Sequence, residues 1–181
     1  NEVGEKVSQH PLVASQAPLE TEQQLFWKAV FHRNTTIVDL TNLQDRKYKG
    51  VDPYYPERFQ ESRRYGAMRV KLVGILNGTY TYQVRNTETG EEKTIRRYHF
   101  PTWPDHGRIP LDDLCILIGR IRTLAPNPSD PIWIHCRAGV GRTGTLLTAF
   151  ILKEKKENGE IDFEHLDAVL VDLILQLRSE R

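Results

Sequence analysis

The chain is predicted to be a single α/β domain with a central, twisted, mixed β-sheet flanked by α-helices. Three observations predict this fold class. A length of 181 residues suits one domain with a sizeable core. Short runs rich in β-branched and aromatic residues alternate with longer apolar segments of helical spacing. Finally, one such strand and one such helix enclose a glycine-rich segment, residues 135–144, which indicates an anion-binding turn at the start of a helix.

The strands are predicted from short apolar or alternating runs. Tyr80-Thr-Tyr-Gln83 alternates as a half-buried strand does, and Asn86-Thr-Glu-Thr-Gly90 supplies the turn of a hairpin. Ile132–His135 is expected to be the central strand, because the glycine-rich segment follows its carboxyl end. In chain order, the predicted strands are Leu12–Ser15, Thr36–Thr41, Met68–Leu72, Tyr80–Arg85, Lys93–Phe100 and Ile132–His135.

The helices are predicted from longer apolar segments with polar ends. The run Leu146–Leu152 continues into charged residues and ends near Gly159, as a helix does. Asp162 is a favourable N-cap for a last helix that runs to the end of the chain. Two further helices are expected at Thr21–Phe31 and at Leu111–Leu124, and Cys115 in the second of them is expected to be a buried thiol.

The glycine-rich segment reads His135-Cys-Arg-Ala-Gly-Val-Gly-Arg-Thr-Gly144. Converging backbone N–H groups and the helix N-terminus predict a phosphate-binding loop between strand and helix. The same field would hold Cys136 as a thiolate, with a pKa in the roughly 3.5–7.5 range of activated cysteines. Arg142 offers a planar fork that matches two phosphate oxygens. The implied chemistry is attack of sulfur on phosphorus, giving a cysteinyl-phosphate intermediate.

Other residues of the loop are expected to support this chemistry. Gly139 and Gly141 would let the backbone approach the ligand and adopt dihedral angles closed to other residues. Thr143 can donate its hydroxyl to the sulfur and so help the thiolate leave in a second step. His135 precedes Cys136 on the strand, so it is better placed to order the loop than to act as a base.

Phosphoryl transfer to sulfur also needs a general acid for the leaving oxygen. Pro101-Thr-Trp-Pro-Asp-His-Gly107 supplies a candidate, and its Pro and Gly residues mark it as a loop. Trp103 can anchor that loop as a hinge or lid. Asp105 is therefore the predicted acid.

Taken together, Tyr98–Gly107 and His135–Gly144 resemble the protein tyrosine phosphatase family, in its cysteine-based and tyrosine-specific type. The similarity extends along nearly the whole chain. It includes Val13-Ala-Ser-Gln-Ala-Pro-Leu19, then Phe26-Trp27 followed by Thr36–Thr41, and Asp52-Pro-Tyr-Tyr-Pro56, where Tyr55 stands in place of the family's Trp.

The resemblance implies a role for each site residue. Cys136 is the nucleophile, and Arg142 binds phosphate. Asp105 is the acid and then the base for the hydrolytic water, while Thr143 assists departure of the thiolate. Substrate-binding residues would be Arg137, Ala138, Gly139, Val140, Gly141, Arg142 and His106, with structural support from His135, Trp103 and Gly107.

Two loops of the family are not visible in the sequence. No loop that recognises the phosphotyrosine ring precedes Val13, and no glutamine-bearing loop follows Leu177-Arg-Ser-Glu-Arg181. Residues 1–181 are therefore expected to be a protein tyrosine phosphatase catalytic domain that is either trimmed at both ends or minimal. The leading activity is hydrolysis of phosphotyrosine in proteins. The alternatives are a dual-specificity or inositol-phosphate phosphatase with the same cysteine chemistry, and a phosphotyrosine-binding pseudophosphatase.

Composition excludes several other classes. A net charge of +1 implies no broad attraction to nucleic acid or membrane, and Arg63-Arg64 and Arg96-Arg97 are expected to be solvated faces. No apolar stretch is long enough to span a membrane, and no signal peptide opens the chain. Gly139-x-Gly141-x-x-Gly144 matches a dinucleotide-binding pattern, but Cys and Arg occupy that turn and no further strand follows the helix.

The remaining expectations concern compartment and cofactors. Two cysteines, one of them needed as a free thiol, indicate a reducing compartment, hence the cytoplasm, or the cytoplasm of another cell for a secreted effector. The histidines at 10, 32, 99 and 165 lack metal-ligand spacing, so no metal and no cofactor is expected. The expected partners are phosphotyrosine-containing protein substrates.

Overall fold

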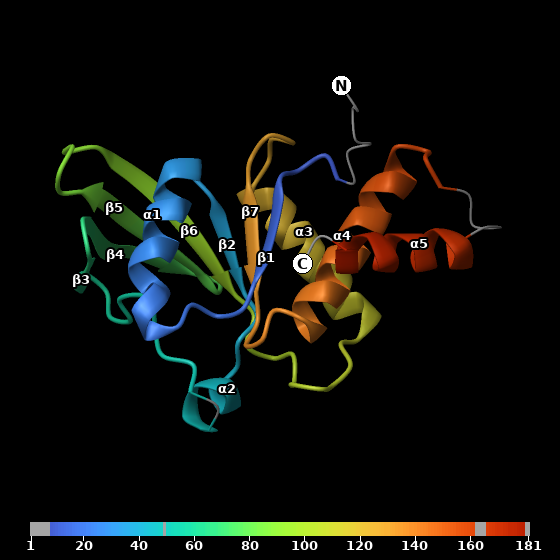
Figure 1. The fold of residues 1–181 in the computed structure, drawn as a ribbon, viewed down its shortest axis with the longest axis horizontal. Coiled ribbons are helices and arrows are strands. Elements are labelled where there is room, and N and C mark those ends of the chain that lie inside the picture. Colours follow the sequence, from blue (N-terminus) through green and yellow to red (C-terminus); the bar gives the residue numbers. More distant parts are fainter. Residues whose placement is uncertain (1–7, 49, 162–165, 180–181) are drawn as a thin grey trace.

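The computed structural model describes residues 8–48, 50–161 and 166–179. Their strands form one seven-stranded sheet in the order β1-β7-β2-β6-β5-β4-β3 (Figure 1). Four neighbours run parallel, namely β1 (Leu12–Ser15), β7 (Ile132–His135), β2 (Thr36–Asp39) and β6 (Glu92–His99). The other strands are antiparallel to their neighbours: β5 (Thr79–Asn86), β4 (Met68–Leu76) and β3 (Ser62–Tyr65). The predicted mixed sheet of an α/β fold is confirmed.

Helices cover both faces of this sheet. α1 (Gln23–Arg33) follows a 3₁₀ turn at Glu20–Glu22 and packs on one face. α3 (Leu111–Leu124) and α4 (Gly141–Glu157) pack on the other face, where they cover the parallel strands. α5 (Leu166–Ser179) lies against α4, and the short α2 (Leu43–Tyr48) follows β2 (Figure 1). The predicted start of the last helix near Asp162 lies outside the described residues.

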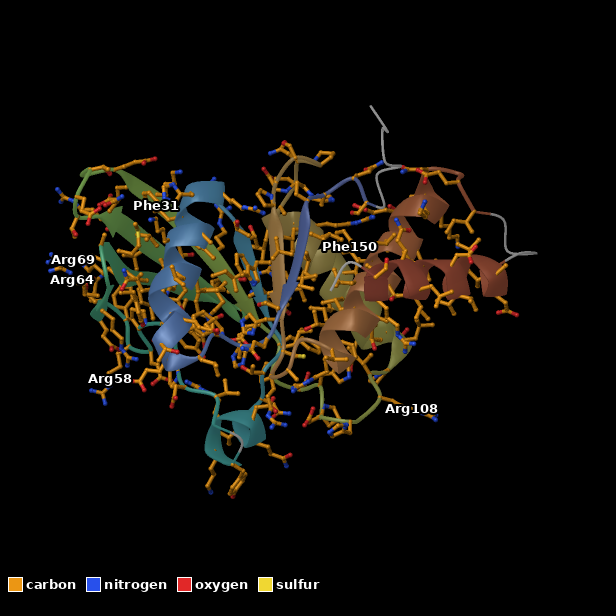
Figure 2. The ribbon with its side chains drawn as sticks, in the orientation of Figure 1. Phe31, Arg58, Arg64, Arg69, Arg108 and Phe150 are labelled. Atoms are coloured by element: carbon orange, nitrogen blue, oxygen red, sulfur yellow. The ribbon has the colours of Figure 1, made fainter. Side chains whose placement is uncertain are left out.

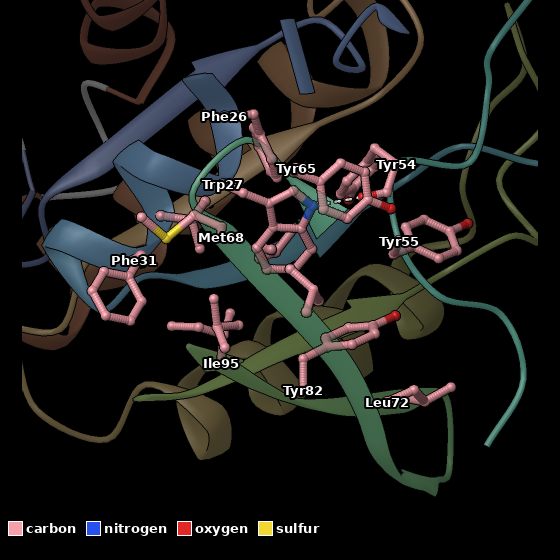
Figure 3. Close-up of a cluster of buried hydrophobic side chains, with 14 residues drawn as sticks. Phe26, Trp27, Phe31, Tyr54, Tyr55, Tyr65, Met68, Leu72, Tyr82 and Ile95 are labelled. Atoms are coloured by element: carbon pink, nitrogen blue, oxygen red, sulfur yellow. Dashed lines mark hydrogen bonds between the residues drawn. The ribbon is translucent and has the colours of Figure 1, made fainter. Parts of the chain in front are cut away.

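Two hydrophobic clusters hold these layers together. Figure 3 shows the first, in which Trp27 of α1 packs among aromatic residues between the helix and the sheet. The Trp27 indole N–H donates to the backbone oxygen of Tyr54 at 2.6 Å, and its ring stacks on Tyr65. The second cluster joins α3 and α4 to β2 and β7 and includes Cys136. The catalytic loop predicted from the sequence therefore rests directly on a core.

The sequence did not predict α2 or β3. Both are short and rich in polar residues, so neither shows a clear apolar period. The structure also extends β4 beyond the predicted Met68–Leu72, because a bulge between Leu72 and Gly74 allows the strand to continue to Leu76.

Two expectations about single residues were wrong. Cys115 is exposed rather than buried, because the buried side of α3 is formed by Leu117, Ile118 and Ile121 and the thiol lies beside that face. Arg97 is 1% exposed rather than solvated. It shares the inward side of β6 with Ile95, and its guanidinium donates to the Asp39 carboxylate at 2.6 Å.

Candidate active site

The predicted site residues lie where the parallel strands β7, β2 and β6 end. Cys136 directly follows β7, the turn at Leu40 follows β2, and the segment that contains Trp103 and Asp105 follows β6. In Figure 1, this edge lies at the bottom of the view, above α2. Open α/β sheets bind ligands at the carboxyl ends of their parallel strands, because the connecting loops meet there.

The loop after Cys136 is shaped by Gly139. This residue has a φ of +73°, and a Cβ placed on it would lie 2.4 Å from the Ser15 carbonyl oxygen. The N–H of Gly139 donates to the Cys136 Sγ at 3.2 Å. The thiol is 3% exposed, so the loop holds it in a recess. The expected dihedral requirement at Gly139 is confirmed, and only glycine fits this close contact between the loop and the end of β1.

Gly141 does not have the unusual dihedral angles that were expected of it from the sequence. It is not among the residues of positive φ, and a Cβ placed on it would meet nothing within 4 Å. The expected dihedral requirement was therefore wrong at this position. Gly141 is instead the first residue of α4, so its backbone is helical.

Arg142 lies in the first turn of α4 and is 5% exposed. One terminal nitrogen, Nη1, donates to the Leu40 carbonyl oxygen at 2.8 Å and pairs with an Asp45 carboxylate oxygen at 2.7 Å. The other, Nη2, contacts the Asp105 carboxylate at 3.3 Å. Within the described part of the chain, the buried Nε has no partner. The guanidinium is thus fixed from several sides while one of its N–H donors remains available.

The segment after β6 is held through Trp103. Its side chain is 3% exposed, and its indole N–H donates to the Gly107 oxygen at 3.3 Å. The Trp103 carbonyl oxygen accepts from Asn42 at 3.3 Å, which ties the segment to the turn after β2. Asp105 is half-buried, and its second carboxylate oxygen lies 3.6 Å from Nε2 of the exposed His106. Trp103 therefore anchors a segment whose polar tip remains accessible.

These groups enclose one cavity of about 430 Å³. Its lining contains both predicted loops, which are about thirty positions apart in the sequence. The lining residues are Trp103, Asp105, His106, Gly107, Cys136, Arg137, Ala138, Val140, Gly141, Arg142 and Thr145. The structure therefore brings the candidate nucleophile, arginine and acid together.

Three predicted residues, Gly139, Thr143 and His135, do not line this cavity. The Thr143 hydroxyl is buried and has no hydrogen-bond partner among the described residues, so the expected bond to the Cys136 sulfur is not formed. His135 lies fully buried behind the loop. Its Nδ1 lies 3.3 Å from the Cys136 carbonyl oxygen, and its Nε2 lies 2.7 Å from the Tyr54 hydroxyl.

Buried charges surround His135. Asp39 Oδ1 lies 3.9 Å from the His135 Nε2, and Asp39 is in turn bonded to Arg97. Burial lowers the pKa of His135 below its ordinary 6.5, although the Asp39 carboxylate acts in the opposite direction. Burial alone would raise the pKa of Asp39. The positive charges of Arg97 and of protonated His135 lower it by more, so the pKa of Asp39 lies well below its ordinary value. Near neutral pH, the pair behind the loop is therefore a neutral imidazole and an ionised carboxylate.

Sequence reasoning missed Asp45 and Tyr54. Asp45 begins α2 through reciprocal hydrogen bonds with Asn42, at 2.9 and 3.0 Å, and this places its carboxylate against Arg142. The spacing Asn42-x-x-Asp45 is that of a helix-start motif and was the available signal. No signal in the sequence pointed from Tyr54 to His135.

Two further observations concern metals and membranes. Among the described residues, no group of three or more His, Cys, Asp or Glu side chains could hold a metal ion. No helix in the described ranges has the length and apolar character needed to cross a bilayer.

The fold and the site together define an α/β domain with a candidate anion-binding loop between a strand and a helix. This loop contains a recessed cysteine and is followed by a buried arginine. The model of the protein-tyrosine phosphatase family matches residues 1–181. The chain belongs to the protein-tyrosine phosphatase family.

Individual relatives agree with this assignment. Receptor-type tyrosine-protein phosphatase eta of Gallus gallus is 34% identical over 77% of the chain, and tyrosine-protein phosphatase 3 of Dictyostelium discoideum is 31% identical over 93%. The chain spans 10% and 18% of the lengths of these two relatives. A solved structure of PTPN18 in complex with HER2-pY1196 phosphopeptides has a TM-score of 0.78 and 24% identity. This match covers 93% of the chain and 58% of the PTPN18 chain, and it supports the fold.

Proposed function

We propose that this domain hydrolyses phosphotyrosine in proteins through a cysteinyl-phosphate intermediate. The observation that carries the proposal is the shared cavity, in which Cys136, Arg142 and Asp105 face one space of about 430 Å³. A cysteine, a fixed guanidinium and a carboxylate are the nucleophile, phosphate clamp and proton donor that this reaction needs. The relatives named as tyrosine-protein phosphatases support the same assignment.

In the proposed first step, Cys136 Sγ forms a bond to phosphorus while the bond from phosphorus to the tyrosine oxygen breaks. Asp105 gives its proton to that oxygen, so tyrosine leaves neutral. In the second step, Asp105 takes a proton from water, the water oxygen attacks phosphorus, and the Cys136 thiolate leaves. The buried Nε of Arg142, which has no partner among the described residues, is the group we propose to donate to a phosphoryl oxygen in both steps.

The proposed preference for phosphotyrosine over phosphoserine is argued from how deeply Cys136 lies in the cavity. Cys136 is 3% exposed at the base of the cavity, so a long aryl ester reaches the sulfur more easily than a short alkyl ester. Tyrosine is also the better leaving group. Phosphotyrosine-containing proteins are accordingly the proposed partners, and residues 1–181 are proposed to act as one catalytic domain in the cytoplasm.

The two alternatives differ at the same site. An inositol-phosphate phosphatase would be expected to carry further Lys or His side chains in the loop, where residues 137–141 provide only the exposed Arg137. A binding-only pseudophosphatase would not need Asp105 to face Cys136 and Arg142 across the same cavity.

The test is turnover of a phosphotyrosine peptide, a matched phosphothreonine peptide and inositol hexakisphosphate. We expect turnover of the phosphotyrosine peptide above all, and loss of that turnover in Cys136→Ser with the phosphopeptide still bound. Cys115→Ser is the matched control, because this cysteine is exposed on α3 and lies outside the cavity. Binding without turnover in the unmodified protein would favour the pseudophosphatase. Comparable rates on phosphothreonine would favour a dual-specificity enzyme.

A further inference from the structure

The antiparallel half of the sheet has one open face. The inward residues of β3–β6 pack under α1, whereas α3 and α4 cover the other side only over the parallel strands. Arg120 of α3 lies at the boundary of the region that α3 and α4 cover. Its guanidinium donates to the Thr79 hydroxyl and lies over the Tyr98 ring. Alternate residues of β3, β4 and β5 beyond this limit therefore face solvent.

Basic side chains gather on this face. Arg64 pairs in register with Arg69, and Arg69 pairs in register with Arg85, so three arginines stand side by side across three strands. Figure 2 shows Arg64 and Arg69 extending together away from the sheet. Lys71 follows on β4 and Arg96 on β6, each at an alternate position on the same side. We call Arg64, Arg69, Lys71, Arg85 and Arg96 the basic face.

The charge of the basic face is not neutralised within the protein. Among the described residues, no carboxylate forms an ion pair with any of its five cations, and Arg64 bonds only to the Gly66 carbonyl oxygen. Like charges directly opposite each other on neighbouring strands destabilise a sheet. The whole chain has a net charge of only +1, so this concentration is local. An anionic partner would relieve the repulsion.

We propose that the basic face docks an acidic segment of a partner protein, rich in Asp and Glu. Four of its five cations are arginines, whose planar forks match carboxylates in two-point contacts. Their spacing follows the distance of about 4.8 Å between strands, so successive carboxylates of one segment crossing the sheet can reach neighbouring arginines. The face lies on the outer strands, apart from the cavity that contains Cys136. The site would recruit a partner without occupying the catalytic cavity.

A peptide segment fits this face better than other polyanions do. Glu92 stands opposite Arg85 at the end of the arginine row. A flat anionic bilayer would meet the Glu92 carboxylate, whereas a narrow segment can contact the arginines alone. The residues in the rows of the basic face include no aromatic side chain on which nucleic-acid bases could stack.

The test measures binding of a fluorescent peptide of alternating Asp and Glu, without phosphate, to the whole chain by anisotropy. Arg64→Gln/Arg69→Gln/Arg85→Gln is expected to weaken binding about tenfold or more, since it removes three charge-assisted contacts. The matched control Lys28→Gln/Arg33→Gln/Arg58→Gln removes the same charge from exposed positions elsewhere and is expected to leave affinity within about twofold. Arg69→Gln alone, at the centre of the row, provides a smaller perturbation of the fold.

Several outcomes would overturn the proposal. One is equal weakening by both triple variants, which would show a general charge effect. Another is an affinity unchanged by loss of the three arginines or by added salt. Tighter binding to duplex DNA or to phosphatidylserine vesicles than to the peptide would assign the face to a different partner. Turnover of a small aryl phosphate is expected to be unchanged in every variant, so this test is independent of the proposed activity.

Discussion

The Arg142 guanidinium is oriented before any phosphate arrives. Leu40, Asp45 and Asp105 supply oxygen atoms at 2.7 to 3.3 Å to its terminal nitrogens, whereas the buried Nε has no partner in the described part of the chain. A preorganised donor loses little freedom when its ligand binds. The contact with Asp105 also fixes the proposed acid relative to the phosphate clamp.

This arrangement predicts a selective effect of Asp105→Ala. Positioned proton transfer contributes about 10²–10⁴ to a rate, so aryl phosphates with poor leaving groups should be slowed by roughly that factor. Esters with good leaving groups need no proton and should be slowed much less. Steady-state kcat/KM over a series of substituted phenyl phosphates measures the difference. Equal slowing across the series would mean that Asp105 only positions Arg142.

Gly139→Ala is expected to destabilise the protein. A non-glycine residue at φ +73° costs about 1–3 kcal/mol, and the new Cβ would also meet the Ser15 carbonyl oxygen at 2.4 Å. Gly141→Ala is the control, because its φ is not positive and its Cβ would meet nothing within 4 Å. Urea denaturation should separate the two variants. Similar free energies of unfolding would show that β1 moves away from the loop at little cost.

At the scale of elements, a buried ion pair joins β2 to β6. The Arg97 guanidinium lies between the rings of Tyr55 and Tyr80, 3.5 and 4.4 Å from their centroids, and donates to Asp39. β2 leads to the oxygen of Leu40 that holds Arg142, and β6 leads to Trp103 and Asp105. The pair therefore fixes the two strands that deliver both sides of the cavity.

Arg97→Met is expected to lower the free energy of unfolding by about 3–5 kcal/mol, because it leaves a buried carboxylate unpaired. Adding Asp39→Asn removes that charge and keeps an oxygen to accept from Thr41. The double variant should therefore be more stable than Arg97→Met alone. Chemical denaturation of the unmodified protein, both single variants and the double variant measures the coupling, and simply additive losses would contradict it.

Much of this element-level structure could be predicted from the sequence. The strands of the parallel half and the helix after the glycine-rich loop follow from apolar runs and their spacing. The Asp39–Arg97 pair was missed because Arg97 was grouped with its exposed neighbour Arg96, although it shares the parity of Ile95. An acid inside an otherwise apolar strand was the signal that a buried cation faces it. The two glycines of the loop look alike in sequence, although only Gly139 has a positive φ and lies against the end of β1.

The whole molecule should lose stability in acid. A His or Asp whose pKa is lowered by folding takes up protons more readily when unfolded, so the free energy of unfolding falls as pH falls. His135 should contribute as pH drops below its ordinary value of 6.5, and Asp39 below its ordinary value of 3.8. Urea midpoints measured from pH 8 to pH 3 test this. Asp39→Asn should flatten the most acidic part of the curve, and an unchanged slope in that variant would assign the loss to other groups.

The order of strands in the sheet has a consequence for biosynthesis. β7, which Cys136 directly follows, inserts between β1 and β2, although it is made after every other strand that the structure describes. Until β7 leaves the ribosome, β1 has no partner among the described strands, and β2 has an open edge that can pair with other chains. A nascent chain that stalls before residue 132 would therefore have an unfinished sheet and would lack Cys136, the proposed nucleophile. The insertion of β7 and the appearance of Cys136 therefore fall together, after the other described strands have been made. Both depend on contacts more than half the chain apart, which close slowly.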